Sequence, residues 1–274
     1  MTPALTDRES HFDFGDNWAQ YAEGVTETHV ARATVALTRL VGPGLAGKSF
    51  LEIGCRSGIH SLAALRLGAA SIVAFDIDAR AVETARALLS HYWRESNWRV
   101  EQRSIFDVAP GSLQADVVYS WGVLHHTGDM WTALERATSL VSPGGHLVIA
   151  LYRKTPMCPF WRIEKRLYAH GPPWYRRAAE AGFTGLFTAA LAATGRNPRR
   201  YIENYGSARG MDFATDIRDW LGGYPYQSAA PAEVRRRMEA KGFTQAQFFP
   251  CKTRFGLLGV GCDEYVFAAA ASAR

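Results

Sequence analysis

Short apolar runs alternate with stretches of helical periodicity through the first half of the chain. The helical stretches cover residues 58–67, 79–92 and 129–141, and the apolar runs are SFLEIG, SIVAFD, WRVEQRS, ADVVYSWG and HLVIALY. Such alternation is typical of parallel strands joined by crossover helices. The pattern predicts an α/β fold, with a Rossmann-like doubly wound sheet that has helices on both faces.

Different patterns flank this region. From Trp18 to Val41 the apolar residues recur at helical spacing, and Gly42-Pro43-Gly44 ends the pattern. The strand–helix rhythm breaks after Tyr152, and a helix beginning at Pro231 and two final apolar runs, TQAQFFP and DEYVFAAAA, restore it. We therefore expect a mostly parallel sheet that ends in a C-terminal antiparallel hairpin strand. The expected segments are an N-terminal helix (1–44), a first half of the core (45–152), a helical insertion (153–230) and the end of the core (231–274).

Composition narrows the class of protein. The chain has 274 residues, 47% of them hydrophobic, and a mean hydropathy of -0.14, which predicts one soluble main domain. No apolar run is long enough to cross a membrane, and the first residues lack an export signal, so no membrane partner is expected. The four cysteines are scattered without a Cys-x-x-Cys pair, which favours a reducing, cytoplasmic location over a zinc or disulfide framework.

Charge is concentrated in the insertion. The whole chain carries +5, whereas residues 152–218 contain twelve Lys or Arg against five Asp or Glu. A solvated, arginine-rich helical surface is the preferred interpretation. A docking face for an acidic substrate is the alternative.

A glycine loop follows the first strand. The strand ends in Glu52-Ile53-Gly54, and Cys55-Arg56-Ser57-Gly58 opens the next helix, so backbone N–H groups lie where a ligand can approach closely. The loop departs from the G-x-G-x-x-G dinucleotide motif because Arg56 replaces the second glycine. An arginine there should obstruct a pyrophosphate, whereas a ligand without phosphates would be affected less.

Acidic residues follow the next two strands. Asp76, 22 residues after Gly54, occupies the position where a carboxylate accepts hydrogen bonds from ribose hydroxyls. Asp107, after the third strand, could accept one from an adenine amine. Asp78 is better interpreted as the N-cap of the following helix. Together Asp76 and Asp107 predict an adenosine site.

In order and spacing, the motifs EIGCRSG, AFDID, SIFD, ADVVYSWGVLHHTGD and LVSPGGHLVIA resemble the class I S-adenosylmethionine-dependent methyltransferases, in particular the small-molecule, quinone-methylase-like branch. The resemblance implies that S-adenosylmethionine is the methyl donor and S-adenosylhomocysteine the product. It places the methionine at Glu52 and Gly54, the ribose at Asp76, and the adenine at Phe106 and Asp107. We further expect Arg56 to face the donor's carboxylate. The residues predicted to bind the donor are Glu52, Gly54, Arg56, Gly58, Asp76, Ile77, Phe106, Asp107 and Trp121.

The same resemblance implies roles for residues on the acceptor side of the site. The loop after the fourth strand faces the sulfonium in this fold, so His125 and His126 are the candidate bases, with His125 slightly preferred. Loop fixing is the competing interpretation for either histidine. The N-terminal helix would act as a lid and the insertion as an acceptor cap, with Tyr21 over the methyl group; aromatic packing is an equal alternative for Tyr21. The predicted acceptor contacts are Trp18, Tyr152, Tyr224 and Tyr226.

The sequence excludes some classes of methyl acceptor and leaves others open. The Asn-Pro-Pro-aromatic motif of base and glutamine methylation is absent, and no cysteine lies in the fourth-strand loop. We therefore predict direct displacement onto an O, N or C atom of a small metabolite or natural-product scaffold. The alternatives are an RNA methyltransferase that uses the basic insertion and a catalytically silent S-adenosylmethionine-binding or partner protein; a dehydrogenase ranks third. No metal is expected, nucleic acid is an improbable partner, and the aromatic content of the insertion allows a homodimer.

Overall fold

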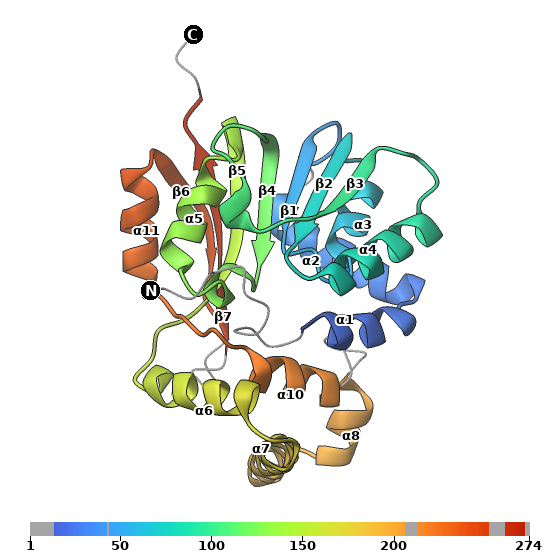
Figure 1. The fold of residues 1–274 in the computed structure, drawn as a ribbon, viewed down its shortest axis with the longest axis vertical. Coiled ribbons are helices and arrows are strands. Elements are labelled where there is room, and N and C mark those ends of the chain that lie inside the picture. Colours follow the sequence, from blue (N-terminus) through green and yellow to red (C-terminus); the bar gives the residue numbers. More distant parts are fainter. Residues whose placement is uncertain (1–13, 43, 206–212, 252–260, 272–274) are drawn as a thin grey trace.

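The computed structural model describes residues 14–42, 44–205, 213–251 and 261–271 (Figure 1). Its centre is one seven-stranded sheet in the order β3-β2-β1-β4-β5-β7-β6. The parallel pairs run from β3 to β5, and β7 is antiparallel to both β5 and β6. The strands are β1 (Ser49–Ile53), β2 (Ser71–Asp76), β3 (Trp98–Gln102), β4 (Ala115–Trp121), β5 (Val141–Tyr152), β6 (Phe243–Phe249) and β7 (Cys262–Ala269). The predicted Rossmann-like sheet with its antiparallel closing strand is confirmed.

Helices cover both faces of the sheet because successive strand residues point to opposite sides. Phe50 of β1 joins a buried apolar cluster with one set of helices, and its neighbour Leu51 joins the cluster on the other face. The first set is α2 (Glu27–Val41), α3 (Ile59–Arg66) and α4 (Ala79–Tyr92), and the second is α5 (Met130–Thr138) and α11 (Pro231–Ala240). The sheet is therefore doubly wound, as the alternating pattern predicted.

The N-terminal region forms two helices, so the prediction of one helix from Trp18 to Val41 was wrong. Helix α1 spans Phe14–Glu23, and α2 begins after Thr26. Gly24 interrupts the pattern, and Thr26 caps α2 while its N–H donates to His29 Nδ1 at 3.1 Å. The break lets α1 turn away from α2 and lie along α4 (Figure 1). Pro43, in the predicted helix stop, lies outside the described residues.

Helix α1 is attached to α4 through one carboxylate. Asp78 caps α4, since its Oδ1 accepts the N–H of Arg80 at 2.8 Å. Its Oδ2 accepts the N–H of Gly15 at 3.1 Å. A Cβ atom at Gly15 would lie 2.7 Å from the carboxylate carbon of Asp78, so a larger residue would displace this carboxylate. The N-cap interpretation of Asp78 is confirmed.

The predicted helical insertion lies between β5 and α11. Its described helices are α6 (Cys158–His170), α7 (Pro173–Ala193), α8 (Pro198–Glu203) and α10 (Phe213–Gly222). They share a buried aromatic and aliphatic cluster of their own, and a second cluster joins α6 to Tyr152 at the end of β5. Figure 1 shows these helices beneath the end of the sheet toward which the β4 arrow points, beside α1. The insertion therefore covers the carboxyl ends of the strands. Arg209 and Asp212, counted in the basic segment, lie outside the described residues.

Helix length and hydropathy bear on whether the described part of the chain could cross a membrane. Among the described helices, none is both long and apolar enough to cross a membrane.

At the start of α3, Gly58 has φ of +79°, and a Cβ there would lie 2.9 Å from Ala85 Cβ and 3.0 Å from Ala85 Cα. The close packing of α3 against α4 therefore depends on glycine at this position.

Replacing Gly58 with alanine tests this packing. Gly58→Ala must accommodate both a left-handed backbone and contact with the α4 backbone, so we expect a loss of about 2–4 kcal/mol in the free energy of unfolding. Gly111→Ala is the matched control, because Gly111 has φ of +75° with nothing within 4 Å of its added Cβ. The control should lose only about 1 kcal/mol. Urea unfolding measures both, and equal losses would contradict the packing argument.

Candidate active site

The glycine loop is folded tightly between two neighbouring strands. The N–H groups of Gly54 and Cys55 both donate to the carbonyl oxygen of Phe75, at 2.8 and 3.1 Å. Gly54 has φ of +77°, and a Cβ there would lie 2.5 Å from the Val123 side chain. Any larger residue would thus displace either the loop or the segment after β4. The loop brings the ends of β1, β2 and β4 together.

Asp76 organises this loop from the end of β2. Its Oδ2 accepts the N–H of Arg56 at 3.0 Å, and its Oδ1 accepts the N–H of Asp78 at 3.1 Å. Burial raises the pKa of Asp76, although these two hydrogen bonds act in the opposite direction. The residue is half-buried, and each carboxylate oxygen retains a lone pair. A ligand with two adjacent hydroxyls could therefore bind there.

The predicted adenine contacts Phe106 and Asp107, and the predicted donor-binding residue Ile77, flank Asp76. Ile77 is 39% exposed, Phe106 is half-buried and Asp107 is exposed. The turn Ile105–Asp107 is fixed by Ser104, whose Oγ accepts the N–H of Phe106 at 3.2 Å. The structure thus brings an apolar side chain, an aromatic ring and a carboxylate to the adjacent ends of β2 and β3, and their contact with adenine stays a prediction.

Arg56 extends from the glycine loop across the end of β4. Its φ is +51°, and it is the one described non-glycine residue with a positive φ. A guanidinium nitrogen donates to the carbonyl of Gly122, and the guanidinium carbon lies 4.9 Å from the centre of the Trp18 ring on α1. A left-handed arginine costs about 1–2 kcal/mol relative to ordinary backbone. The site therefore maintains a strained residue that links the loop, β4 and α1.

Glu52 lies buried beneath the glycine loop. Ser61 Oγ donates to its Oε2, and His60 Nδ1 lies 3.8 Å from Oε1. Burial raises the pKa of Glu52 to about 8. Burial likewise lowers the pKa of His60 to about 4, so both groups are predominantly uncharged at neutral pH. Glu52 is thus held against α3 in a neutral, hydrogen-bonded form, and its contact with the donor stays a prediction.

Two predicted site residues pack against the core. Trp121 Nε1 donates to Glu264 Oε1 at 2.8 Å, and its ring joins the cluster beneath α2 and α3. Tyr21 packs on the same cluster, with its ring centre 5.5 Å from that of Trp18. Burial raises the pKa of Tyr21 to about 12, so its phenol is neutral. Donor contact by Trp121 and methyl capping by Tyr21 stay predictions.

The predicted base His125 is fully buried. Its Nδ1 accepts the N–H of Tyr152 at 3.3 Å, so the proton of the neutral ring is on Nε2. That Nε2 has no hydrogen-bond partner among the described residues. Burial, followed by the charges of His126, Arg56 and Lys165, holds the pKa of His125 well below its usual value. His125 is therefore suited to donating a hydrogen bond from Nε2.

His126 has the opposite tautomer. Its Nδ1 lies 2.8 Å from the carbonyl oxygen of Pro225 and must donate to it. The Nε2 of neutral His126 therefore carries a lone pair. Nothing in this arrangement assigns catalysis to either histidine, and their role as bases stays a prediction.

Sequence reasoning missed Lys165, a fully buried cation of α6. Its Nζ donates to the carbonyl of Trp220 and lies 3.7, 5.6 and 5.9 Å from the ring centres of Trp220, Tyr226 and Tyr152. No described carboxylate forms an ion pair with it, and burial lowers its pKa. Lys165 lies at helical spacing from two buried aromatic residues, Trp161 and Tyr168. A lysine within an apolar stripe was the available signal.

Asp219 of α10 was also missed. Its Oδ1 is buried without a hydrogen-bond partner among the described residues, while Asn17 of α1 provides a side-chain hydrogen bond to the carboxylate. Burial raises the pKa of Asp219 to about 6, and the charges of Arg56 and Lys165 oppose this rise. Asp219 thus lies within the electrostatic reach of both the glycine loop and α6.

The predicted acceptor contacts divide between two places. The Tyr152 ring lies 3.9 Å from His125 and 5.3 Å from Tyr226, so these side chains gather at the end of β5. Trp18 lies beside Arg56 on the lid side. Tyr224 instead packs against His170, at a ring distance of 5.2 Å. Acceptor binding by these residues stays a prediction.

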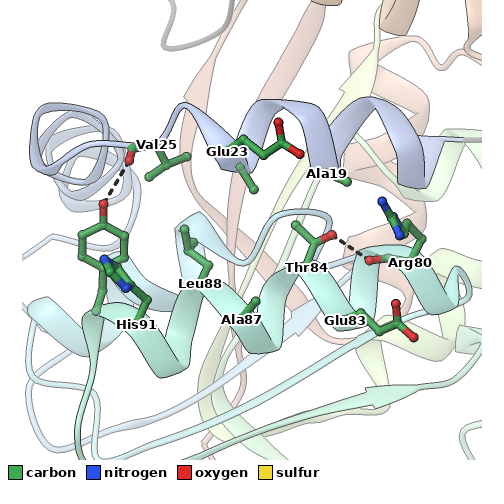
Figure 2. Close-up of a pocket in the computed structure, with 11 residues that line it drawn as sticks. Ala19, Glu23, Val25, Arg80, Glu83, Thr84, Ala87, Leu88 and His91 are labelled. Atoms are coloured by element: carbon green, nitrogen blue, oxygen red, sulfur yellow. Dashed lines mark hydrogen bonds between the residues drawn. The ribbon is translucent and has the colours of Figure 1, made fainter.

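A separate groove runs between α1 and α4 (Figure 2). Its labelled residues include Ala19 and Glu23 of α1 and Arg80, Thr84 and His91 of α4. None of the predicted donor or acceptor residues lines it, and neither do the strand ends. The groove is therefore distinct from the candidate site.

The described residues contain no group of three His, Cys, Asp or Glu side chains placed to hold a metal ion.

Comparison with known proteins gives a family for the donor half. Residues 51–147 match the family model "Methyltransferase domain". A curated relative, ribosomal protein L11 methyltransferase of Photobacterium profundum, is 35% identical over 46% of this chain. The match spans 40% of that relative, so the chain covers less than half the length of the curated relatives it matches.

Solved structures of methyltransferases share the fold. Magnesium protoporphyrin IX methyltransferase from Synechocystis PCC 6803, with bound S-adenosylhomocysteine, has a TM-score of 0.55 at 14% identity, covering 93% of each chain. An S-adenosylmethionine-dependent methyltransferase from Mesorhizobium loti has a TM-score of 0.51 at 15% identity, covering 90% of this chain and 99% of that one. The matched segment and the fold agree: residues 51–147 match a methyltransferase domain, and the chain shares its fold with these solved methyltransferases.

Proposed function

We propose that the chain transfers a methyl group from S-adenosylmethionine to a small molecule by direct displacement. The observation that carries the proposal is the position of Asp76, which fixes the glycine loop while retaining acceptor capacity for two ribose hydroxyls. The bound donor would supply an electrophilic sulfonium methyl group. The protein then has to bind the donor, orient the acceptor and exclude water.

The residues present suit this donor. Asp76 would hold the ribose, Ile77, Phe106 and Asp107 would border the adenine, and the turn from Gly54 would admit the methionine backbone. The guanidinium of Arg56 would hold the donor's carboxylate, for which it is positively charged and geometrically suited. Its hydrogen bond to Gly122 would then be exchanged for, or shared with, the ligand.

The helical insertion supports a small acceptor. Helices α6 and α10 cover the strand ends, and Lys165 and His125 are completely shielded from solvent between them and the sheet. A small molecule can be enclosed in such a place, whereas a folded macromolecule would have to displace the covering helices. A protein acceptor is the second candidate, because the curated relatives that match include a ribosomal protein L11 methyltransferase.

The first experiment identifies the acceptor class. The purified chain is incubated with methyl-labelled S-adenosylmethionine and a cell extract separated into small-metabolite, RNA and protein fractions. We expect the label in the small-metabolite fraction. Label in protein would establish the second candidate, label in RNA would make the basic insertion a nucleic-acid surface, and binding without transfer would indicate a silent partner protein.

Loss of the Asp76 carboxylate should weaken donor binding. Asp76→Asn places an amide N–H₂ against a backbone N–H group and removes the charge that holds the ribose, so the Kd for S-adenosylhomocysteine should rise about 10- to 100-fold. Asp116→Asn is the control, since Asp116 hydrogen-bonds Ser49 at the opposite end of the strands. Calorimetric titration measures both variants. An unchanged Kd for Asp76→Asn would exclude this donor site.

Arg56→Gly tests the proposed contact with the donor's carboxylate. Glycine tolerates the φ of +51°, so the loop should keep its conformation and only the side chain is lost. The affinity for S-adenosylhomocysteine should fall about tenfold, in line with loss of a charge-assisted hydrogen bond. Methylthioadenosine, which lacks the amino-acid group, is the matched ligand, and its affinity should stay unchanged. Equal effects on the two ligands would place Arg56 elsewhere.

A further inference from the structure

Buried polar atoms without partners gather where the insertion meets the strand ends. Among the described residues the buried unpaired side-chain atoms are Trp18 Nε1 of α1, Ser57 Oγ of the glycine loop, His125 Nε2, both carboxylate oxygens of Glu164 on α6, and Asp219 Oδ1 and Trp220 Nε1 of α10. An unpaired buried donor or acceptor costs about 1–3 kcal/mol, so a concentration of such atoms needs an explanation. A polar ligand that completes their hydrogen bonds provides one.

Ring contacts connect two of these side chains, Trp220 and His125. The Trp220 ring is 5.3 Å from the Tyr152 ring, which is 3.9 Å from the ring of His125. The Lys165 ammonium lies 3.7 Å from the centre of the Trp220 ring and donates to the Trp220 carbonyl. The Trp220 and Lys165 side chains of the insertion therefore lie beside Tyr152 and His125 at the end of β5.

The Asp219 side of the cluster reaches toward the predicted donor. Asp219 interacts electrostatically with both Arg56 and Lys165, and Asn17 of α1 bonds its carboxylate. Arg56 in turn contacts Gly122 and Trp18. Asp219 thus lies within electrostatic reach of both Arg56 and the buried lysine.

The unpaired atoms include both hydrogen-bond donors and acceptors. The indole N–H groups of Trp18 and Trp220 and the Nε2–H of His125 can donate, whereas Asp219 and Glu164 can accept. A hydroxyl group is complementary to this mixture, because it both donates and accepts. A carboxylate ligand would satisfy only the donors and would face two acidic side chains.

The charges around this cluster also favour a neutral ligand. Arg56 supplies positive charge and Asp219 opposes it, while burial lowers the pKa of Lys165 to about 7 and raises the pKa of Glu164 to about 7, so neither sign of charge is in excess. The faces of Trp220, Tyr152 and Tyr226 supply apolar surface for the carbon skeleton of the ligand. A neutral molecule with hydroxyl groups fits these conditions.

We propose that the acceptor is a neutral, hydroxyl-bearing small molecule and that Asp219 takes the hydroxyl proton during transfer. The proposal rests on the proposed function. The acceptor's O–H bond breaks and its proton moves to Asp219 Oδ1, while the oxygen forms a bond to the methyl carbon and the methyl–sulfur bond breaks. The products are a methyl ether, S-adenosylhomocysteine and a protonated Asp219, which returns its proton to solvent before the next cycle.

The alternatives for the base are less suited. His125 already carries its proton on Nε2, so it would donate to the acceptor oxygen and orient it. His126 keeps a lone pair on Nε2 and is the competitor that the experiment must distinguish. Lys165 is a positioning residue, since it bonds the Trp220 carbonyl next to Asp219.

The charged groups around Asp219 influence the pKa of its carboxyl group. Arg56 faces it from the glycine loop, Lys165 from α6 and Asp216 from its own helix, with the neutral Asn17 on α1. Burial is the largest effect and raises the pKa of Asp219 to about 6, so the carboxylate form predominates at pH 7. A base of this kind should make the transfer rate rise with pH through about 6.

The chemical identity of the labelled product tests the acceptor class. The full chain and methyl-labelled S-adenosylmethionine are incubated with small metabolites separated by anion exchange into neutral and acidic fractions. We expect a neutral product whose label resists mild alkali and is released by hydriodic acid, as a methyl ether requires. Alkali-labile label in the acidic fraction would indicate a methyl ester, and label that survives both treatments would indicate N- or C-methylation. Either result would overturn the proposal.

Asp219→Asn tests the base. Its transfer rate should fall about 100-fold, and the rise of the rate through pH 6 should disappear. The Kd for S-adenosylhomocysteine and the cooperative unfolding transition should be retained. Glu203→Gln, an exposed acid on α8 of the same insertion, is the matched control and should behave as the unmodified chain.

His126→Gln separates the two remaining bases. A normal rate in Asp219→Asn, or loss of the pH dependence in His126→Gln and not in Asp219→Asn, would overturn the role of Asp219 while leaving the methyltransferase function standing. Failure of the unmodified chain to bind S-adenosylhomocysteine or to label any fraction would instead refute the proposed function, and this inference with it.

Discussion

The Asp76 carboxylate is the interaction on which the candidate site depends. One oxygen holds the N–H of Arg56 in the glycine loop, and the other holds the N–H of Asp78 at the start of α4. Asp78 then uses its own carboxylate to cap α4 and to bind Gly15 of α1. Two neighbouring carboxylates therefore connect β2, the glycine loop, α4 and the N-terminal helix. The position of each part follows from the others, which is how a site assembled from distant segments becomes a single rigid arrangement.

The insertion contributes a different kind of constraint. Its helices have an apolar cluster of their own, so they are held together independently of the sheet, yet they place Lys165 and Asp219 at the contact with the strand ends. Burying these groups without ion pairs costs stability, as do the left-handed Arg56 and the unpaired indole nitrogens. Such costs concentrate where a protein has functional rather than structural requirements. In this chain they occur in the glycine loop, in α1 and in the part of the insertion that meets the strand ends.

The sequence predicted the sheet half of this arrangement well because its signals are local. Strand alternation, the Asp78 cap and the glycine loop each depend on residues close together in the chain. The break between α1 and α2 was missed because the apolar spacing continues across it, and only Gly24 and the Thr26 cap mark it. Lys165 and Asp219 could not be predicted as a pair, since 54 positions of an irregular helical segment separate them in the sequence and only tertiary packing of α6 against α10 brings them together. The tautomers of His125 and His126 likewise depend on distant backbone groups of Tyr152 and Pro225.

The contact between Gly15 and Asp78 has a consequence for how this sequence can vary. A side chain at position 15 would collide with the carboxylate at position 78, and shortening residue 78 to make room would remove the cap from α4. Asn or Ser at position 78 could still cap the helix, but a larger residue at position 15 would displace it as well. Neither position can therefore change alone without a cost, and the two form a coupled pair across 63 residues of sequence. Each of these two positions accordingly restricts the substitutions that the other tolerates.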